Sequence, residues 1–160
     1  MPKLLKIYTN PNPLLRQKSK DIKPDNIKQE KYKLLRADMI NTMLKKDGVG
    51  LAAPQIGKNI RLIAVNLKDG PICLFNPVLT KLSWRQEWGE EGCLSVPLVF
   101  GKVKRHVKVV CEYFDGSGEM KKLEASGLMA RVLQHEIDHL DGVLFIDKAK
   151  GVHRIELNSK

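Results

Sequence analysis

A pair of histidines with a glutamate between them carries the strongest chemical signal in this chain. Residues 135–139 have the pattern H-E-x-x-H, with His135, Glu136 and His139 as its fixed members. Each residue turns an α-helix by about 100°, so side chains four positions apart differ in direction by only about 40°. Both imidazoles can therefore hold one metal ion, and Glu136 lies close enough to move the protons of a water molecule there. The pattern predicts a metal-dependent hydrolase, but two ligands do not complete a site.

A cysteine upstream is a candidate for the third ligand. Cys93 lies between glycine and proline residues in the segment GEEGCLSVP, residues 89–97, which should form a tight, non-helical segment. A thiolate binds zinc and ferrous iron well, and one thiolate with two imidazoles leaves a fourth position for water. Cys73 and Cys111 stand in apolar segments, and we interpret them as small buried hydrophobic residues.

A glycine-rich segment with an amide at its end is the third feature that suggests chemistry. Residues 48–55 read GVGLAAPQ. The glycines allow close approach to the backbone, and Gln55 supplies an amide donor of the kind that stabilises an oxyanion. Alone this is a weak signal, because a glycine-rich turn after a helix is usually only a turn. The spacing fits neither the dinucleotide-binding pattern G-x-G-x-x-G nor the P-loop.

Two stretches have the periodicity of helices that would position these residues. Residues 26–46 carry apolar side chains near a 3.6-residue period, and Gly48 follows as a stop signal. The H-E-x-x-H pattern belongs to a second helix at residues 126–140, with Ser126 as a plausible N-cap and Gly142 after its end.

The segments between the two helices favour β-strands. Extended segments are predicted at residues 60–67, 72–75, 78–82, 107–114, 119–125 and 143–146. The pair at 107–125 is expected to form a hairpin. We therefore predict an α+β fold, with mostly antiparallel sheets packed around a C-terminal H-E-x-x-H helix and an additional N-terminal helix.

The bulk composition sets limits on organisation and location. A chain of 160 residues predicts a single domain over residues 1–160, with a short polar tail from about residue 148. No apolar run approaches the roughly 20 residues that a membrane span needs. Three cysteines without close pairing favour a reducing compartment, and we expect a cytoplasmic protein. The net charge of +10 would attract polyanions, although the basic residues are scattered.

Three motifs in one order give this chain a resemblance to a known family. The segments GVGLAAPQ, EGCLS and QHEIDH occur in the sequence of motifs that characterises peptide deformylase. The resemblance spans residue 8 to about residue 147, and residues 13–16 and 141–145 are also similar. It implies a hydrolase that removes the formyl group of N-formylmethionine from newly synthesised bacterial proteins.

The resemblance also implies roles for individual residues. Cys93, His135 and His139 correspond to the metal ligands, and Glu136 to a general base that later acts as an acid. The family most often uses ferrous iron in cells, and zinc, nickel or cobalt can occupy the site. The matching positions for oxyanion stabilisation and peptide binding are Gln55, the backbone N–H of Leu94, and Gly50.

Further contacts to the substrate are hypotheses from spacing and resemblance. The methionine side chain needs an apolar slot, for which Val49, Leu128, Ile137 and the ring edge of His135 are candidate walls. Arg105 corresponds to a family arginine near the peptide-binding edge, although a solvated cation in a basic stretch is nearly as good an interpretation.

The partners implied are N-formylmethionyl nascent peptides and the ribosome near its tunnel exit, with no membrane, and we expect a monomer. The longer C-terminal helix of many bacterial members is shortened or absent here, because residues 148–160 are mostly polar. Docking on the ribosome through that helix therefore lacks support from the sequence.

Two other interpretations remain open from the sequence. Peptidases with the H-E-x-x-H pattern usually take their third ligand downstream, where Asp141, Asp147 and His153 are available. A basic RNA- or ribosome-binding domain with a vestigial site is the alternative from another class.

The third ligand separates the two enzyme hypotheses. We expect Cys93→Ser to abolish binding of one divalent ion per chain, measured by metal analysis after anaerobic purification, because an alcohol is a much poorer ligand than a thiolate. Substitution of His153 or Asp147 should leave metal content unchanged. Loss of metal in those variants, with metal retained in Cys93→Ser, would instead support the peptidase.

Overall fold

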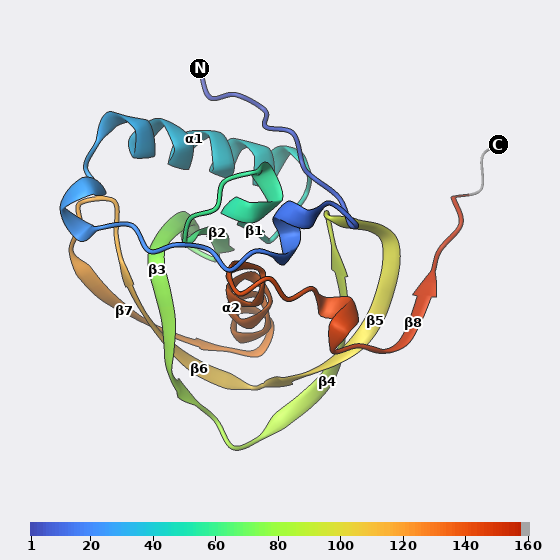
Figure 1. Ribbon diagram of the computed structural model, residues 1–160. Helices are drawn as coiled ribbons and strands as arrows, with labels where there is room; N and C mark the ends of the chain where they lie inside the picture. Colours follow the sequence, from blue (N-terminus) through green and yellow to red (C-terminus); the bar gives the residue numbers. More distant parts are fainter. Residues whose placement is uncertain (158–160) are drawn as a thin grey trace.

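The computed structural model describes residues 1–157, which form two antiparallel β-sheets and two α-helices (Figure 1). The five-stranded sheet has the order β1-β2-β3-β6-β7. Its strands are β1 (Gly50–Ala52), β2 (Leu62–Leu67), β3 (Gly70–Leu82), β6 (Lys108–Phe114) and β7 (Met120–Ser126). The three-stranded sheet has the order β4-β5-β8, with β4 (Gln86–Cys93), β5 (Val96–His106) and β8 (Lys150–Arg154). The predicted α+β fold class is confirmed.

Helix α2 (Gly127–Leu140) lies in the centre of the molecule, with the sheets curving around it (Figure 1). Leu133 and Leu140 are completely buried against Ile63, Val65 and other residues of the five-stranded sheet. A helix that is buried on most of its circumference can hold polar side chains inside the protein only if they have specific partners. The polar residues of α2 must therefore be explained by the site.

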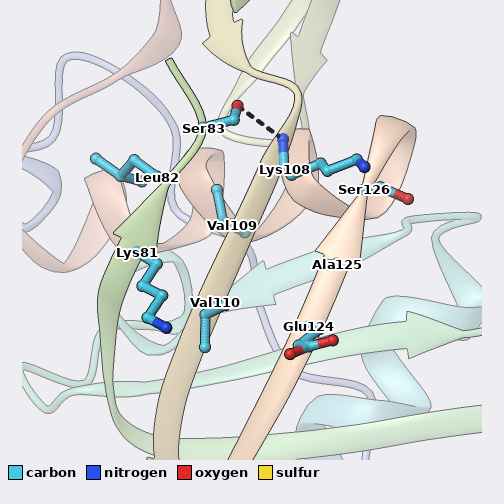
Figure 2. A pocket seen from close by; sticks show the side chains of 9 residues that line it. All are labelled: Lys81, Leu82, Ser83, Lys108, Val109, Val110, Glu124, Ala125 and Ser126. Atoms are coloured by element: carbon cyan, nitrogen blue, oxygen red, sulfur yellow. Dashed lines mark hydrogen bonds between the residues drawn. The ribbon is translucent and has the colours of Figure 1, made fainter. Parts of the chain in front are cut away.

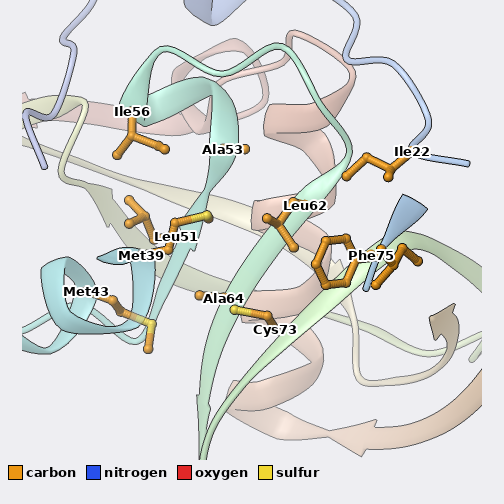
Figure 3. Packing of buried hydrophobic residues seen from close by; sticks show 11 residues of the cluster. Ile22, Met39, Met43, Leu51, Ala53, Ile56, Leu62, Ala64, Cys73 and Phe75 are labelled. Atoms are coloured by element: carbon orange, nitrogen blue, oxygen red, sulfur yellow. The ribbon is translucent and has the colours of Figure 1, made fainter. Parts of the chain in front are cut away.

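Helix α1 (Glu30–Lys45) covers the opposite face of the five-stranded sheet. Met39 and Met43 belong to one apolar cluster with residues of this sheet, and Figure 3 shows Met39 beside Leu51, and Leu62 beside Phe75. Successive strand residues point to opposite faces, so Leu62 faces α1 whereas Ile63 faces α2. Burial on both faces explains why the first four residues of β2, 62–65, are all apolar.

A third apolar cluster fixes the three-stranded sheet. Leu15 and Val103 pack with Leu144 and Phe145, which lie beyond the end of α2. The ring of Phe145 stacks on that of His135, with centroids 6.1 Å apart and planes inclined by 24°. This cluster holds the start of β5, and with it the turn that follows Cys93, against the helix.

Several predicted elements differ from the observed ones. Helix α1 begins at Glu30 rather than residue 26, because Pro24 opens a separate 3₁₀ helix. The two short strands predicted around Asn76 are one strand, β3, bent by an irregular register with Asn76 at a φ of 50°. The extended segment predicted at residues 143–146 contains part of a 3₁₀ helix, Phe145–Asp147. Ser126 is the N-cap residue of α2, but its side chain accepts no capping hydrogen bond.

The three-stranded sheet is the main feature that the sequence did not predict. The β4–β5 hairpin replaces an expected turn, and β8 lies within the segment predicted as a polar tail. Within residues 1–157, no helix is long and apolar enough to cross a membrane.

One buried amide joins α2 to the three-stranded sheet. The side chain of Gln134 accepts a hydrogen bond from the backbone N–H of His106 (3.0 Å) and donates one to the backbone carbonyl oxygen of His106 (2.9 Å). His106 is the last residue of β5, so these bonds fix the position of α2 relative to the three-stranded sheet.

Replacement of Gln134 tests this link. We expect Gln134→Leu to lower the free energy of unfolding by about 1–3 kcal/mol, because the polar groups of His106 lose their partners in a water-poor environment. Urea denaturation at a fixed metal concentration measures the change. Gln29→Leu, at an exposed position, is the control. Equal stability of the two variants would contradict the proposed link.

Candidate metal centre and active site

Three potential metal ligands converge between β4 and α2. The ligand atoms of Cys93, His135 and His139 all lie within 4.8 Å of one another. The Cys93 sulfur lies 3.3 Å from Nε2 of His139. One thiolate and two imidazoles are a donor set that suits a divalent transition metal. The residues present therefore fit the metal that the H-E-x-x-H pattern predicts.

Local backbone geometry brings the cysteine to the helix. The register of the β4–β5 hairpin shifts between Gly92 and Cys93, so that Cys93 pairs with Val96 across a two-residue turn. A β-carbon on Gly92 would lie 2.6 Å from the ring of Phe100. Gly92 therefore lets the hairpin close tightly, which places the sulfur beside the two histidines.

A buried carboxylate orients the first histidine. Glu91 accepts a hydrogen bond from Nδ1 of His135 (2.8 Å), and its two oxygens also accept bonds from Arg105 (2.9 Å each) and Arg131 (2.8 Å). Burial alone would raise the pKa of Glu91, but the hydrogen bonds from His135 and Arg105 lower it to about 2. The carboxylate can only accept, so Nδ1 is the donor and Nε2 is left for the metal.

The electrostatic field also favours a cation at this position. Burial lowers the pKa of His135, but hydrogen bonds to Cys93 and Glu91 outweigh it and raise that pKa to about 10. The surroundings of His135 therefore favour positive charge at this position, which a bound divalent ion would supply. Burial and the nearby His135 depress the pKa of His139 well below its usual range, which keeps that imidazole in the neutral form that a metal ligand needs.

Glu136 is enclosed beside this cluster. Its side chain is buried, and Oε2 has no hydrogen-bond partner within residues 1–157. Burial raises the pKa of Glu136 to about 7, against a smaller opposing effect of His135. A carboxylate that titrates near neutrality can take up and release a proton at low cost. These properties fit a general base.

A cavity of about 450 Å³ opens onto the cluster. Glu136, Cys93 and His135 line it together with Gln55 and Leu94. Gln55 is 2% exposed, and its Nε2 lies 3.5 Å from the Cys93 sulfur and 3.1 Å from the hydroxyl oxygen of Ser95. Its amide is thus fixed beside the Cys93 sulfur.

A second hollow is unrelated to this chemistry. Figure 2 shows it over β3, β6 and β7, where Lys81, Val110 and Glu124 are among its walls. It contains none of the clustered ligands, so the functional site is placed at the cavity beside Cys93.

The structure places some of the residues predicted to contact the substrate at the cavity and others elsewhere. Val49, Gly50 and Leu128 line the cavity. Ile137 does not: it packs in the core between α2 and the five-stranded sheet, so its prediction as a pocket wall is wrong. Arg105 is 4% exposed and bonded to Glu91 and Asp138, so it has no surface free for a peptide.

Some lining residues were missed from the sequence. Arg131, Val132 and Phe100 line the cavity, and Glu91 holds His135. The first two lie four and three positions before His135, and this helical spacing was a usable signal. The hydrogen bond between Glu91 and His135 joins residues 44 positions apart, so no local pattern in the sequence predicts it.

The downstream candidates for the third ligand lie elsewhere. Asp147 pairs with Arg16, and Asp141 with Arg61. His153 is on β8 and lies 3.7 Å from Glu90. The one Cys/His cluster found among the described residues contains Cys93 and neither Asp141, Asp147 nor His153.

Gly50 provides a test of how Glu136 is positioned. A β-carbon at Gly50 would lie 2.6 Å from Oε1 of Glu136 and 2.8 Å from its Cγ, so Gly50→Ala should displace the carboxylate. We expect the turnover number for hydrolysis of a formyl-methionyl peptide, measured as formate release, to fall about 100-fold with metal content retained. Gly48→Ala, whose β-carbon would meet no atom closer than 3.4 Å, should retain activity. Full activity in Gly50→Ala would show that the contact does not matter.

Comparison with known proteins agrees with this site. A model of the polypeptide deformylase family matches residues 4–154. The peptide deformylase of Dictyoglomus thermophilum is 48% identical over 138 residues, covering 86% of this chain and 88% of that protein. The peptide deformylase of Natranaerobius thermophilus is 47% identical over 152 residues, covering 94% and 96% respectively.

Solved structures give the same result. The crystal structure of peptide deformylase from Thermotoga maritima matches with a TM-score of 0.88 and 37% identity, covering 92% of this chain and 99% of that chain. A peptide deformylase from Synechococcus elongatus, in complex with actinonin, matches with a TM-score of 0.87 and 38% identity, covering 94% and 82%. The chain belongs to the polypeptide deformylase family, metal-dependent enzymes that remove the N-terminal formyl group from newly synthesised proteins.

Proposed function

We propose that Cys93, His135 and His139 hold one divalent metal ion and that Glu136 beside them handles the protons of formyl hydrolysis. The observation that carries this proposal is the convergence of three ligand atoms within 4.8 Å of one another, in a cavity that Glu136 also lines. The substrates are N-formylmethionyl nascent peptides, and the products are formate and a free α-amino group.

The metal and Glu136 are proposed to have different roles in hydrolysis of the formyl group. When bound, a divalent ion supplies a Lewis acid that lowers the pKa of a water molecule and polarises the formyl carbonyl. Glu136 takes a proton from the attacking water and delivers it to the amine nitrogen as the carbon–nitrogen bond breaks. Its pKa of about 7 suits both halves of this transfer at neutral pH.

Donors around the cavity stabilise the charge that develops on the carbonyl oxygen. Gln55 and the backbone N–H of Leu94 are proposed as these donors, because both residues line the cavity next to Cys93. A donor held in place before the reaction stabilises an oxyanion more than a mobile one does. The Gln55 side chain is held in this way, since its Oε1 accepts a bond from Ala52 N (2.9 Å).

The residues that line the cavity are proposed to select the substrate. Gly50 lies at the edge of the cavity and is proposed to hydrogen-bond the peptide backbone. Val49 and Leu128 are exposed apolar residues that line the cavity and are proposed to contact the methionine side chain. Formyl carries only hydrogen on its carbonyl carbon, so a narrow site would exclude larger acyl groups.

Ferrous iron is the metal we propose in cells, with zinc, nickel or cobalt able to replace it. The sulfur and nitrogen ligands suit all four ions, so availability decides between them. Activity lost in air and restored by nickel or cobalt would support iron, because ferrous iron is oxidised in air.

The setting of the enzyme is also proposed. All three cysteines are free thiols, which supports a reducing compartment, and we propose a cytoplasmic monomer that works near the ribosomal tunnel exit. Residues 150–154 form strand β8 on the three-stranded sheet, so contact with the ribosome would use a surface other than a helix there. The set of metal donors, buried base and oriented histidine speaks against an RNA-binding domain with a vestigial site.

The decisive experiment separates metal binding from proton transfer. Glu136→Gln, purified without oxygen, should retain about one metal ion per chain while formate release from formyl-Met-Ala falls about 10²–10⁴-fold, the usual effect of losing a general base. Glu90→Gln, which also lines the cavity but is exposed, is the matched control and should stay active.

Wild-type turnover in Glu136→Gln would contradict its proposed role. No formate release by the metal-loaded wild type would contradict the proposed function itself.

A further inference from the structure

The N-terminal segment, residues 1–12, runs from α1 to the turn of the β4–β5 hairpin (Figure 1). Near its start, the backbone N–H of Leu5 donates to Oγ1 of Thr42 on α1 (2.9 Å). Just after its end, the buried Leu15 packs in the same apolar cluster as Val96, the first residue of β5. The middle of the segment is therefore anchored from both sides.

Between these anchors, two backbone hydrogen bonds reach the elements that carry the proposed oxyanion donors. The N–H of Tyr8 donates to the carbonyl oxygen of Gln55 (2.7 Å), and the N–H of Asn10 donates to that of Ser95 (2.8 Å). Ser95 directly follows Leu94, whose own N–H is the second proposed donor. One short stretch of chain thus binds both donor-bearing elements.

The element that carries Gln55 is short and depends on such contacts. Gln55 lies on a 3₁₀ helix, η3 (Ala53–Ile56), which ends at Gly57 with a φ of 81°. A 3₁₀ helix of this length has poor hydrogen-bond geometry, so contacts with the rest of the protein must fix its position. Tyr8 supplies its N–H and also its ring, because a β-carbon on Gly57 would lie 2.8 Å from Cε2 of that ring. The ring therefore lies directly against the end of η3.

The two residues that the segment binds are also joined through their side chains. Nε2 of Gln55 lies 3.1 Å from Oγ of Ser95, and both residues are buried. The separation of their backbones therefore affects where the Gln55 amide lies. An oxyanion donor must lie about 2.7–3.1 Å from the position of the developing charge, so a small displacement of η3 weakens it.

We propose that Tyr8 is a positioning residue for the reaction. Its backbone N–H and its ring hold η3, and with it the Gln55 amide, where the oxyanion develops. This inference rests on the function proposed above and on the role proposed there for Gln55. Tyr8 is not among the residues that line the cavity, so it acts through Gln55 and not by contact with the substrate.

Removal of a single N–H group tests the proposal without changing a side chain. Nonsense suppression replaces Tyr8 by its α-hydroxy acid in the full chain, which turns the amide between Ile7 and Tyr8 into an ester that cannot donate. We expect kcat for formyl-Met-Ala to fall about tenfold with KM and metal content retained, since a misplacement of about 1 Å can cost about 100-fold. The same replacement at Tyr32, whose N–H donates to the carbonyl oxygen of Gln29 (3.0 Å), is the matched control and should retain kcat.

A double-variant cycle shows whether the effect passes through Gln55. Gln55→Ala keeps the backbone carbonyl that Tyr8 binds but lacks the amide, so the ester at position 8 should cause no further loss of kcat in that background. A merely structural role would lower kcat by the same factor in both backgrounds. In the zinc-loaded protein, the NMR signal of the Gln55 side-chain amide, identified by its loss in Gln55→Ala, should shift with the ester at position 8 and not with that at position 32.

Replacement of the ring is the second test and serves if the ester variant does not fold. Tyr8→Ala should lower kcat in the same direction, because η3 loses the contact at Gly57, whereas Tyr8→Phe keeps the ring and should retain activity.

Unchanged kcat in the folded ester variant, or in Tyr8→Ala where that variant replaces it, would overturn the inference. So would an equal loss of kcat in the Tyr32 variant, an equal further loss in Gln55→Ala, or an unshifted amide signal. Wild-type turnover in Gln55→Ala alone would instead overturn the role proposed for Gln55. No formate release by the metal-loaded wild type would overturn the proposed function.

Discussion

The buried carboxylate of Glu91 is the constraint on which the arrangement of the site depends. It lies on the inner face of the β4–β5 hairpin and accepts hydrogen bonds from His135 and Arg131 on α2 and from Arg105 on β5. A buried charge that loses a partner is costly, so the hairpin and the helix can dock in only one relative position. That position brings Cys93, two residues further along β4, to the histidines. The buried ion pairs of Glu91 therefore set the docking that brings the three ligands together.

The groups that need the greatest precision lie on elements buried from two sides. Helix α2 carries two of the clustered ligands and Glu136, and it packs against the five-stranded sheet on one side and the hairpin on the other. The residues proposed to contact the substrate, such as Val49 and Leu128, are exposed and line the cavity. An enzyme that acts on many different polypeptide chains needs rigid support for its reacting groups and accessible walls for substrate recognition.

Much of the site could be predicted from the sequence because its signals are local. The spacing of His135 and His139 fixes their common direction, and the glycine and proline residues around Cys93 predict a tight segment. The error at Ile137 was avoidable: it lies two residues after His135, about 200° around the helix, and so faces the sheet. Arg105 was harder, since a buried arginine depends on Glu91 and Asp138, which are distant in the sequence. The β4–β5 hairpin escaped prediction because β4 presents Gly89 and Glu91 to α2, so the usual alternation of apolar and polar residues is missing from that strand.

The separation of the ligands along the chain has a consequence for the stability of the folded protein. Cys93 and His139 are 46 positions apart, and they belong to a hairpin and a helix that no disulfide connects. An ion held between them acts as a reversible cross-link, whose binding free energy adds to the stability of the folded state. Loss of the ion would lower the stability of the folded protein and leave the docking of the hairpin on α2 to the buried ion pairs of Glu91.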